Sequence, residues 1–141
     1  MHVLVPVDGS RPSEEALRYA FEQFADDELT ALYVKDPIDG STAWGQASAD
    51  DWMAAAEEHA EKILRNAEDL AAEAGVQIRT DTVLGRPSRA IIEYVDEHGV
   101  DHVVVGSHGR DGVSRVLLGS VAEVVVRRST VPVTVVRARE D

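Results

Sequence analysis

The sequence predicts an α/β fold in which helices cover both faces of a parallel sheet. Five short runs rich in valine, leucine and isoleucine alternate with longer segments whose apolar residues recur at helical spacing. Such alternation indicates parallel strands joined by right-handed crossovers, with helices on both faces. The chain has 141 residues, enough for one domain with its own core, and we expect residues 1–141 to form that domain.

The first half of the chain is predicted to contain two strands and two helices. Residues 2–7 are expected to form a strand buried on both faces, after which Ser10 caps a helix with Pro12 in its first turn. The buried stripe of this helix consists of Leu17, Ala20, Phe21 and Phe24. We expect a strand over residues 29–34, a functional or disordered loop over 36–50, and a helix over 51–74 that Gly75 ends.

The second half is predicted to contain three strands and two helices. Residues 76–83 alternate as a strand does, and Pro87 begins a helix that Gly99 closes. The inward face of this helix consists of Ile91, Tyr94, Val95 and His98. A strand over 101–106, a glycine-bearing loop, a helix over 119–128 and a strand over 131–136 complete the alternation.

The glycine-bearing loop is the strongest functional signal in the chain. Gly106, Gly109 and Gly119 allow the backbone to approach an anion closely, and Ser120 adds a hydroxyl where the next helix begins. The N-terminus of that helix supplies N–H groups without partners and the positive end of its dipole. Three side chains in the segment can add positive charge, namely His108, Arg110 and Arg115.

Spacing alone leaves two interpretations of this loop open. It is either a phosphate-binding loop or an ordinary connection in which Ser120 acts as an N-cap. The spacing is not that of a P-loop, because no Gly-Lys-Ser/Thr occurs in the chain, and it is not the Rossmann G-x-G-x-x-G pattern.

A second candidate lies at the end of the first strand. Ligands of open parallel sheets bind beyond the carboxyl ends of strands, where the strand order reverses. Asp8 and Gly106 end the first and fourth strands, so we expect them to flank one crevice. Asp8 is either a turn residue or a carboxylate that accepts hydrogen bonds from ribose hydroxyls.

The composition excludes several classes of function. The chain has 14 basic and 26 acidic residues, a net charge of −12, whereas proteins that follow a nucleic-acid backbone are basic. The acidic, lysine-poor composition predicts adaptation to high salt, which screens self-repulsion. There is no cysteine, and no run reaches the ~20 apolar residues of a membrane span. Because no signal peptide precedes the first strand, we expect a cytoplasmic protein.

No catalytic residue and no metal site is predicted. His98 and His102 are four residues apart, but Gly99 and a strand start separate them, so they are not a helical ligand pair. Ser107 and His108 are neighbours without the G-x-S-x-G surroundings of a nucleophile elbow.

Three segments carry a resemblance that covers essentially the whole chain. They are Val5-Pro6-Val7-Asp8-Gly9-Ser10, Gly106-x2-Gly109-x9-Gly119-Ser120 and Val131-Pro132-Val133-x-Val135-Val136. With these motifs the chain resembles the ATP-binding branch of the universal stress protein family. The resemblance implies a Rossmann-like sheet of five parallel strands, in the order 3-2-1-4-5, that binds ATP at its carboxyl edge.

The resemblance also implies roles for the matching residues around the nucleoside. Asp8 would hold the ribose, and the backbone at Val34 would meet the adenine, alongside Pro6 and Val7. Gly106 would lie against the ribose and the α-phosphate.

For the phosphates, the resemblance implies a cradle made by Gly109, Gly119 and Ser120. A Mg²⁺ ion on the phosphates would be held mostly by phosphate oxygens and water. The predicted nucleotide-binding set consists of Pro6, Val7, Asp8, Val34, Gly106, Ser107, His108, Gly109, Arg110, Gly119, Ser120 and Val121.

Three functions compete at this point. The first is an ATP-binding regulatory or stress-response protein with little or no turnover, whose nucleotide changes the surface shown to protein partners. The second is a slow Mg-ATP-dependent ATPase or phosphotransferase, which needs a positioned base and charge compensation. The third is a phospho-acceptor receiver domain, which needs a lysine after the last strand, yet no lysine follows Lys62. We predict the first and keep the second as the alternative.

The last strand is the predicted dimer contact. The resemblance implies homodimers that pair through this strand, and residues 131–136 are apolar. Pro132 fits an edge strand better than a central one, and an apolar sheet edge must be covered or paired.

Overall fold

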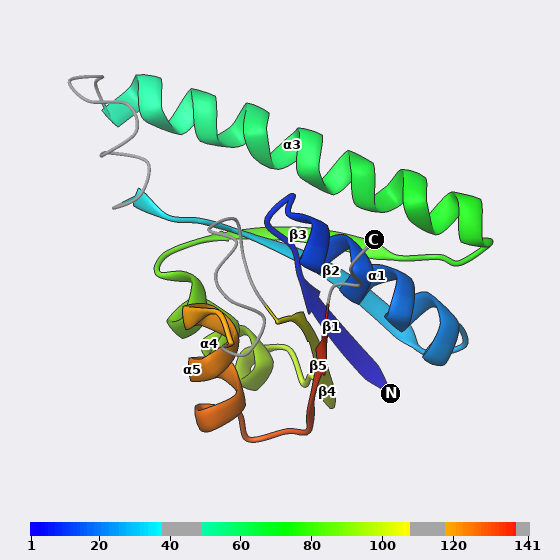
Figure 1. Cartoon of the computed structure of the whole chain (residues 1–141). Helices are drawn as coiled ribbons and strands as arrows, with labels where there is room; N and C mark the ends of the chain where they lie inside the picture. The colour runs from blue at the N-terminus through cyan, green and yellow to red at the C-terminus, as the bar shows by residue number, and fades with distance from the viewer. Residues whose placement is uncertain (38–48, 108–117, 138–141) are drawn as a thin grey trace.

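The computed structural model describes residues 1–37, 49–107 and 118–137 (Figure 1). Its strands are β1 (His2–Pro6), β2 (Glu28–Lys35), β3 (Arg79–Leu84), β4 (His102–Gly106) and β5 (Val133–Val136). All strand pairs are parallel, and the sheet has the order β3-β2-β1-β4-β5, which confirms the predicted topology.

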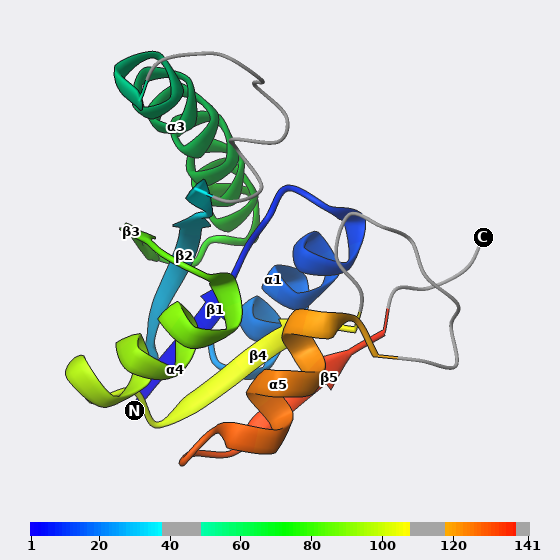
Figure 2. The same ribbon diagram turned by 90° about the vertical axis from the view of Figure 1, so that its left-hand side faces the viewer.

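Helices cover both faces of the sheet, as the strand–helix alternation predicts. The helices in the described ranges are α1 (Arg11–Gln23), α3 (Ala49–Ala74), α4 (Pro87–Glu97) and α5 (Ser120–Arg128). Figures 1 and 2 show α1 and α3 on one face of the sheet and α4 and α5 on the other.

The central strand β1 joins the two hydrophobic cores. Val3 and Val5 belong to the cluster beneath α1 and α3, whereas Leu4 belongs to the cluster beneath α4 and α5. All three side chains are at most 1% exposed, because successive residues of a strand point to opposite faces and both faces are covered. The carboxyl end of β1 is therefore held in place by both layers of helices.

The predicted start of α1 and the predicted end of α3 are confirmed by their capping contacts, whereas α3 begins at Ala49 rather than at residue 51. The Ser10 hydroxyl oxygen accepts a hydrogen bond from the Ser13 N–H at 3.3 Å, which makes Ser10 the N-cap of α1. Gly75 follows α3 with a φ of +72°, the left-handed conformation that commonly ends helices.

The third strand begins later than predicted. Its residues were expected over 76–83, but pairing with β2 starts at Arg79. The Val76 N–H instead donates to the carbonyl of Ala71 at 2.9 Å, so this residue completes the end of α3. The alternating pattern extended into the connection because Val76 and Ile78 also pack against the core.

Two predictions of inward-facing or extended residues were wrong. His98 was expected on the inner face of α4, but it is the exposed C-cap of that helix and its ring stacks on Tyr94 at 3.7 Å. The last strand was expected from residue 131, but it begins at Val133. Pro132 has no N–H to donate, although its carbonyl accepts from the Val103 N–H at 3.0 Å.

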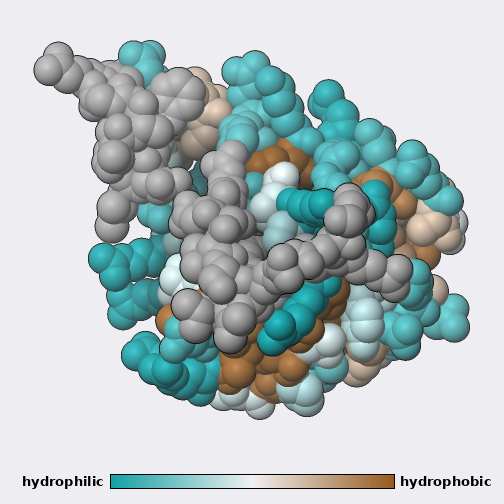
Figure 3. All heavy atoms as spheres, in the orientation of Figure 1, coloured by the Kyte–Doolittle hydropathy of each residue, from teal (hydrophilic) through white to brown (hydrophobic). Residues whose placement is uncertain are grey.

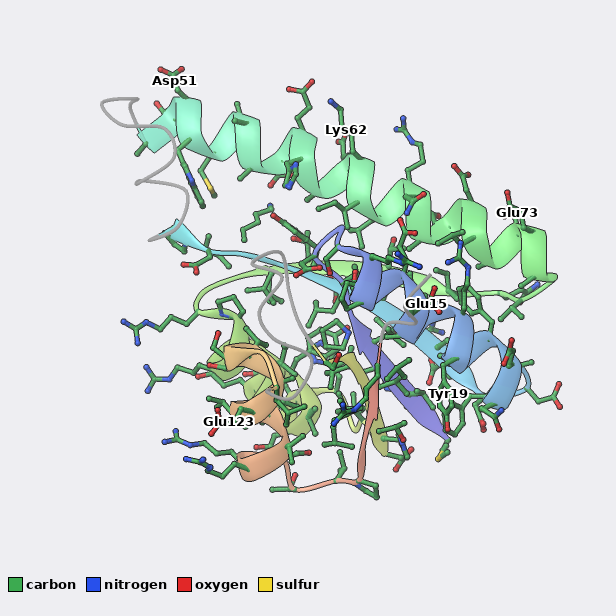
Figure 4. All side chains as sticks on the ribbon, viewed as in Figure 1. Glu15, Tyr19, Asp51, Lys62, Glu73 and Glu123 are labelled. Atoms are coloured by element: carbon green, nitrogen blue, oxygen red, sulfur yellow. The ribbon has the colours of Figure 1, made fainter. Side chains whose placement is uncertain are left out.

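Charged side chains occupy the outer surfaces of the helices. Figure 4 shows Asp51, Lys62 and Glu73 pointing away from the sheet along α3, and Glu123 lies on the outside of α5. This distribution is that of amphipathic helices with one buried stripe. None of the helices that the structure describes is long and apolar enough to cross a membrane.

Candidate functional site

The candidate site lies at the carboxyl edge of the sheet, between β1 and β4. The chain leaves β1 toward β2 on one side, and β4 pairs with β1 on the other side, so the strand order reverses between them. Such a switch point opens a crevice beyond the strand ends. Asp8 follows β1 and Gly106 ends β4, so the two predicted residues flank this point.

Gly106 is in close contact with the first turn of α1. A Cβ atom on Gly106 would lie 2.6 Å from both the carbonyl carbon and the carbonyl oxygen of Pro12. Because the contacted atoms belong to the backbone of Pro12, they cannot move aside without shifting the chain, so only glycine fits here. This contact brings the β1–α1 turn and the end of β4 together, and it gives Gly106 a packing role that the glycine pattern alone did not reveal.

The β1–α1 turn presents the Asp8 carboxylate at this edge. The Ser10 N–H donates to Asp8 Oδ1 at 2.9 Å, a local bond typical of an aspartate turn. Gly9 between them has a φ of +83°, which favours glycine. Among the described residues, Asp8 Oδ2 has no hydrogen-bond partner, and Asp8 is only partly buried. Asp8 is thus both a turn residue and an available acceptor.

The backbone of Val34 lies beyond the end of β1, on the side that β1 occupies earlier in β2. The carbonyl of Leu32 accepts from the Val7 N–H at 2.9 Å, so Leu32 directs its backbone groups toward β1. Val34 lies two residues further and directs its backbone groups to the same side. Because β1 ends at Pro6, opposite Leu32, no described strand residue pairs with Val34 on that side. The N–H donor and the carbonyl acceptor of Val34 therefore both face the switch-point side of β2.

The two ends of the glycine-bearing loop are tied together. The Ser107 N–H donates to the Val136 carbonyl at 2.9 Å, and the Ser107 carbonyl accepts from the Gly119 N–H. Ser107 is 4% exposed. Its backbone groups and the Gly119 N–H are thus used within the protein, so Gly119 contributes the absence of a side chain rather than a free donor.

Helix α5 directs its N-terminus toward the same edge. Its first intrahelical bond runs from the Glu123 N–H to the Gly119 carbonyl at 2.9 Å, so the N–H groups of Ser120, Val121 and Ala122 have no partner inside the helix. Ser120 is exposed. These three donors, with the helix dipole behind them, form an anion-binding end.

Three predicted binding residues lie outside the described part of the chain: His108, Gly109 and Arg110. Within the described ranges, no group of three or more metal-ligating side chains gathers. The His98 and His102 pair behaves as predicted, since one ends α4 and the other begins β4.

Sequence reasoning missed two residues that shape the site. Pro12 was assigned only to the helix start, although its backbone abuts Gly106. Ser13 was not singled out, although it is 6% exposed and its hydroxyl bonds to the β1–α1 turn. The serine spacing at positions 10 and 13 was an available signal, because a polar residue buried in a first turn usually bonds back to the cap.

A comparison with models of protein families shows to which family the chain belongs. The model of the universal stress protein family matches residues 1–137. The chain belongs to this family. The predicted family is thereby confirmed, and the motif positions in β1, the glycine segment and β5 all fall inside the match.

Relatives from this family cover nearly the whole chain. Universal stress protein MJ0531 of Methanocaldococcus jannaschii is 35% identical over 141 residues, covering 96% of this chain and 81% of that protein. The solved structure of MJ0577, from the same organism, superposes with a TM-score of 0.83 at 28% identity and covers 99% of this chain and 97% of that chain. The fold seen here is therefore that of solved universal stress proteins.

A nucleotide is present in a solved structure of a similar protein. A universal stress protein solved in complex with cAMP superposes with a TM-score of 0.70 at 31% identity, covering 99% of this chain and 98% of that chain. Nucleotide binding thus occurs in a universal stress protein of this similarity.

Proposed function

We propose that this universal stress protein binds ATP at the carboxyl edge of β1 and β4 and acts as a nucleotide-dependent regulator with little or no turnover. The observation that carries the proposal is the convergence of three features on one edge. These are the backbone N–H and carbonyl of Val34, the available oxygen of Asp8 and the N-terminus of α5. They match the base, the sugar and the phosphates of one nucleotide.

The backbone of Val34 supports a preference for adenine. Its N–H can donate to a ring nitrogen of adenine, and its carbonyl can accept from the adjacent amino group. Guanine presents an oxygen and a ring N–H at the corresponding edge, so donor would face donor and acceptor would face acceptor. ATP is therefore expected to bind more tightly than GTP.

The α5 end and Asp8 support the ribose and phosphate assignments. Asp8 Oδ2 can accept hydrogen bonds from ribose hydroxyls, and the N–H groups of Ser120, Val121 and Ala122 can donate to phosphate oxygens. The predicted contacts of Pro6, Val7, Gly106 and Ser107 remain part of this proposal, as do those of His108, Gly109 and Arg110. Mg²⁺ would be held chiefly by phosphate oxygens and water, because the described residues offer no cluster of carboxylates.

The arrangement supports a switch better than a catalyst. Phosphoryl transfer needs a base or a water-positioning group near the terminal phosphate, with positive charge around it. Within the described residues, Asp8 is the carboxylate of the β1–α1 turn, and the proposed function assigns it to the ribose. Slow hydrolysis of Mg-ATP remains the alternative that the first experiment distinguishes.

A homodimer through β5 belongs to the same proposal. β5 is the outer strand of the sheet, and all four of its residues are only partly buried in the single chain. Figure 3 shows hydrophobic surface low in the view, where Figure 1 places α5 and β5. A second copy would cover this edge. Val135→Glu should then shift the sedimenting species from dimer to monomer, and an unchanged dimer would exclude this contact.

The first experiment is to denature the freshly purified protein and identify any released nucleotide by chromatography and mass. ATP at about one per chain would support tight binding with negligible turnover. ADP alone, after exchange during purification has been excluded, would favour the slow ATPase. A protein that is empty and ignores added ATP would overturn the proposal.

The second experiment fills the phosphate end of the site. Gly119 has φ −64° and ψ 159°, an extended conformation open to any residue, so Gly119→Val should fold and block close approach of phosphate. Ser120→Glu places a carboxylate against the phosphates and should likewise abolish ATP binding. Val126→Glu, the control, adds the same charge at an exposed position toward the other end of α5 and should bind normally. Normal binding by Gly119→Val or Ser120→Glu would contradict the assignment.

A further inference from the structure

Ser13 is a buried polar residue whose hydroxyl serves the β1–α1 turn rather than the core. It is 6% exposed and lies in the first turn of α1. Its Oγ–H donates to the Ser10 carbonyl at 3.0 Å, and its Oγ accepts from the Asp8 N–H at 3.4 Å. One hydroxyl therefore joins both ends of the turn that carries Asp8.

The carboxylate of Asp8 is fixed by the same network. The Ser10 N–H donates to Asp8 Oδ1 at 2.9 Å, so Ser10 holds the side chain while Ser13 holds the main chain of Asp8. With Oδ1 occupied, Oδ2 is the oxygen left for a ligand. The direction in which Oδ2 points is thus set by two serines.

Helix capping does not explain the Ser13 hydroxyl. The N-cap bond of α1 uses the Ser10 hydroxyl and the backbone N–H of Ser13, which any residue except proline would supply at that position. The Ser13 hydroxyl instead reaches outside the helix to Asp8. Gly9, at the tip of the turn, would place a Cβ 3.3 Å from the Ile63 side chain, so packing also restricts movement of the turn. The hydroxyl thus adds two hydrogen bonds to a turn that also packs against Ile63.

We infer that Ser13 is a positioning residue. It holds the Asp8 carboxylate where it can accept hydrogen bonds from ribose hydroxyls, and it thereby determines selectivity for ribonucleotides. The inference rests on the proposed function. Its physical basis is that a hydrogen bond to a carboxylate depends steeply on angle and distance, so a small movement of the turn weakens it. In this inference Ser13 acts through Asp8, because its hydroxyl bonds to the Asp8 N–H and the Ser10 carbonyl.

The test compares ATP with 2′,3′-dideoxy-ATP, which lacks both ribose hydroxyls. The wild type should bind ATP about tenfold more tightly than the dideoxy analogue, as expected for hydrogen bonds to a charged group. Ser13→Ala should reduce this ratio to about two- or threefold by weakening ATP alone. A purely structural loss would weaken both nucleotides equally and leave the ratio unchanged.

Two further variants calibrate the measurement. Asp8→Ala should remove the preference for ATP over the dideoxy analogue. Adding Ser13→Ala to Asp8→Ala should not change the affinity ratio further, because the two residues act in series. Ser129→Ala is the matched control. The Ser129 hydroxyl also bridges a backbone carbonyl and N–H, both of Val131, but it lies after α5 and away from Asp8. It should lower stability and leave the ratio intact.

The outcomes separate this inference from the proposed function. If the wild type discriminates and Ser13→Ala keeps the full ratio, the inference is wrong and nucleotide binding stands. If the wild type binds both nucleotides equally, the ribose role of Asp8 falls together with the role of Ser13. If the wild type binds neither, the proposed function fails as well. Should Ser13→Ala not fold, Ser13→Cys keeps the branching of the side chain with a weaker donor and should give an intermediate ratio.

Discussion

The amino and carboxyl edges of the sheet carry similar polar residues, but these residues bond differently at the two edges. At the amino edge, side chains pair with one another. Tyr94 donates to Asp81 Oδ2 at 2.8 Å, and His2 Nε2 lies 2.9 Å from Thr30 Oγ1. On the opposite face of the sheet, His102 Nε2 lies 2.8 Å from Thr134 Oγ1. Each of these pairs joins two different elements, so the polar side chains at this edge bond to one another. His2, Thr30, Asp81 and Tyr94 also line an open pocket at this edge, so their hydrogen bonds are completed although the surface is hollowed.

At the carboxyl edge, the polar groups are positioned but leave an open side. Asp8 is bonded through one oxygen, Val34 has a backbone pair beyond the end of β1, and α5 begins with donors that have no partner in the helix. The comparison teaches that residue type does not distinguish structure from function here. The distinction is whether the chain itself completes the hydrogen bonds.

The largest expected effect comes from adding a methyl group where Gly106 meets the backbone of Pro12. Gly106→Ala places a methyl group 2.6 Å from the Pro12 backbone and should lower the free energy of unfolding by about 3 kcal/mol, since one backbone must move. Denaturant unfolding measures this loss. It should also weaken ATP binding, because the β1–α1 turn moves with Pro12.

Gly75→Ala is the control for glycine replacement. Gly75 has a φ of +72° but open space around its Cβ, so only backbone strain of about 1 kcal/mol is expected. Equal losses in the two variants would show that the Gly106–Pro12 contact is not limiting.

The next effect comes from removing one partner of a hydrogen-bonded pair at the amino edge. Tyr94→Phe leaves Asp81 Oδ2 without its donor and should cost about 1–2 kcal/mol of stability. Because the pair faces away from the carboxyl edge, ATP affinity should not change. A Tyr94→Phe protein with weakened ATP binding would show that the two edges are coupled.

The same pair predicts a dependence on pH. Burial, and then the hydrogen bond to Asp81, raise the pKa of the Tyr94 hydroxyl above its ordinary value of 10.0. Folding therefore favours the neutral hydroxyl, and this stabilisation is complete below pH ~10 and is lost as the pH rises above it. Stability of the wild type should fall more steeply above pH ~10 than that of Tyr94→Phe. Parallel pH profiles would contradict this.

Salt should separate these short-range pairs from the charge of the whole surface. With a net charge of −12, the chain repels itself at low ionic strength, and molar salt screens that repulsion. The melting temperature should rise between low and molar salt, by about 3–5 °C for each kcal/mol gained. A melting temperature that does not rise would remove the expectation of adaptation to high salt.

The smallest effect is expected for an exposed ion pair at the amino edge. Arg79 Nη1 lies 2.9 Å from Glu28 Oε1, but the Arg79 side chain is 76% exposed. Arg79→Gln should change the free energy of unfolding by about 0.5 kcal/mol or less. A loss as large as that of Tyr94→Phe would mean that exposure is a poor guide to the strength of these pairs.

The order of the elements could be predicted because it depends on patterns within each segment. β1 is an uninterrupted apolar run, α1 has a serine cap, and α3 ends at Gly75; each of these was confirmed. The sheet order came from the resemblance to the family rather than from periodicity, and it was confirmed as well.

What the sequence could not give depends on contacts between distant residues. Gly106 looked like a phosphate-loop glycine, yet its close neighbour is Pro12, which lies far away in the chain. His98 has the helical spacing of a core residue, but α4 ends at Glu97 and the ring turns outward onto Tyr94. The nucleotide contacts, from Pro6 through Val121, stay predictions.

The strand order also bears on how the protein can be synthesised. As the chain leaves the ribosome, β2 can dock beside β1, β3 beside β2, β4 on the other side of β1, and β5 beside β4. Every new strand adds to an edge that already exists, so the sheet never has to open to admit one. Folding of the N-terminal half can therefore begin before the rest emerges. The α1 surface that meets β4, and the face of β1 and β2 that α4 and α5 cover, must wait uncovered until the second half arrives.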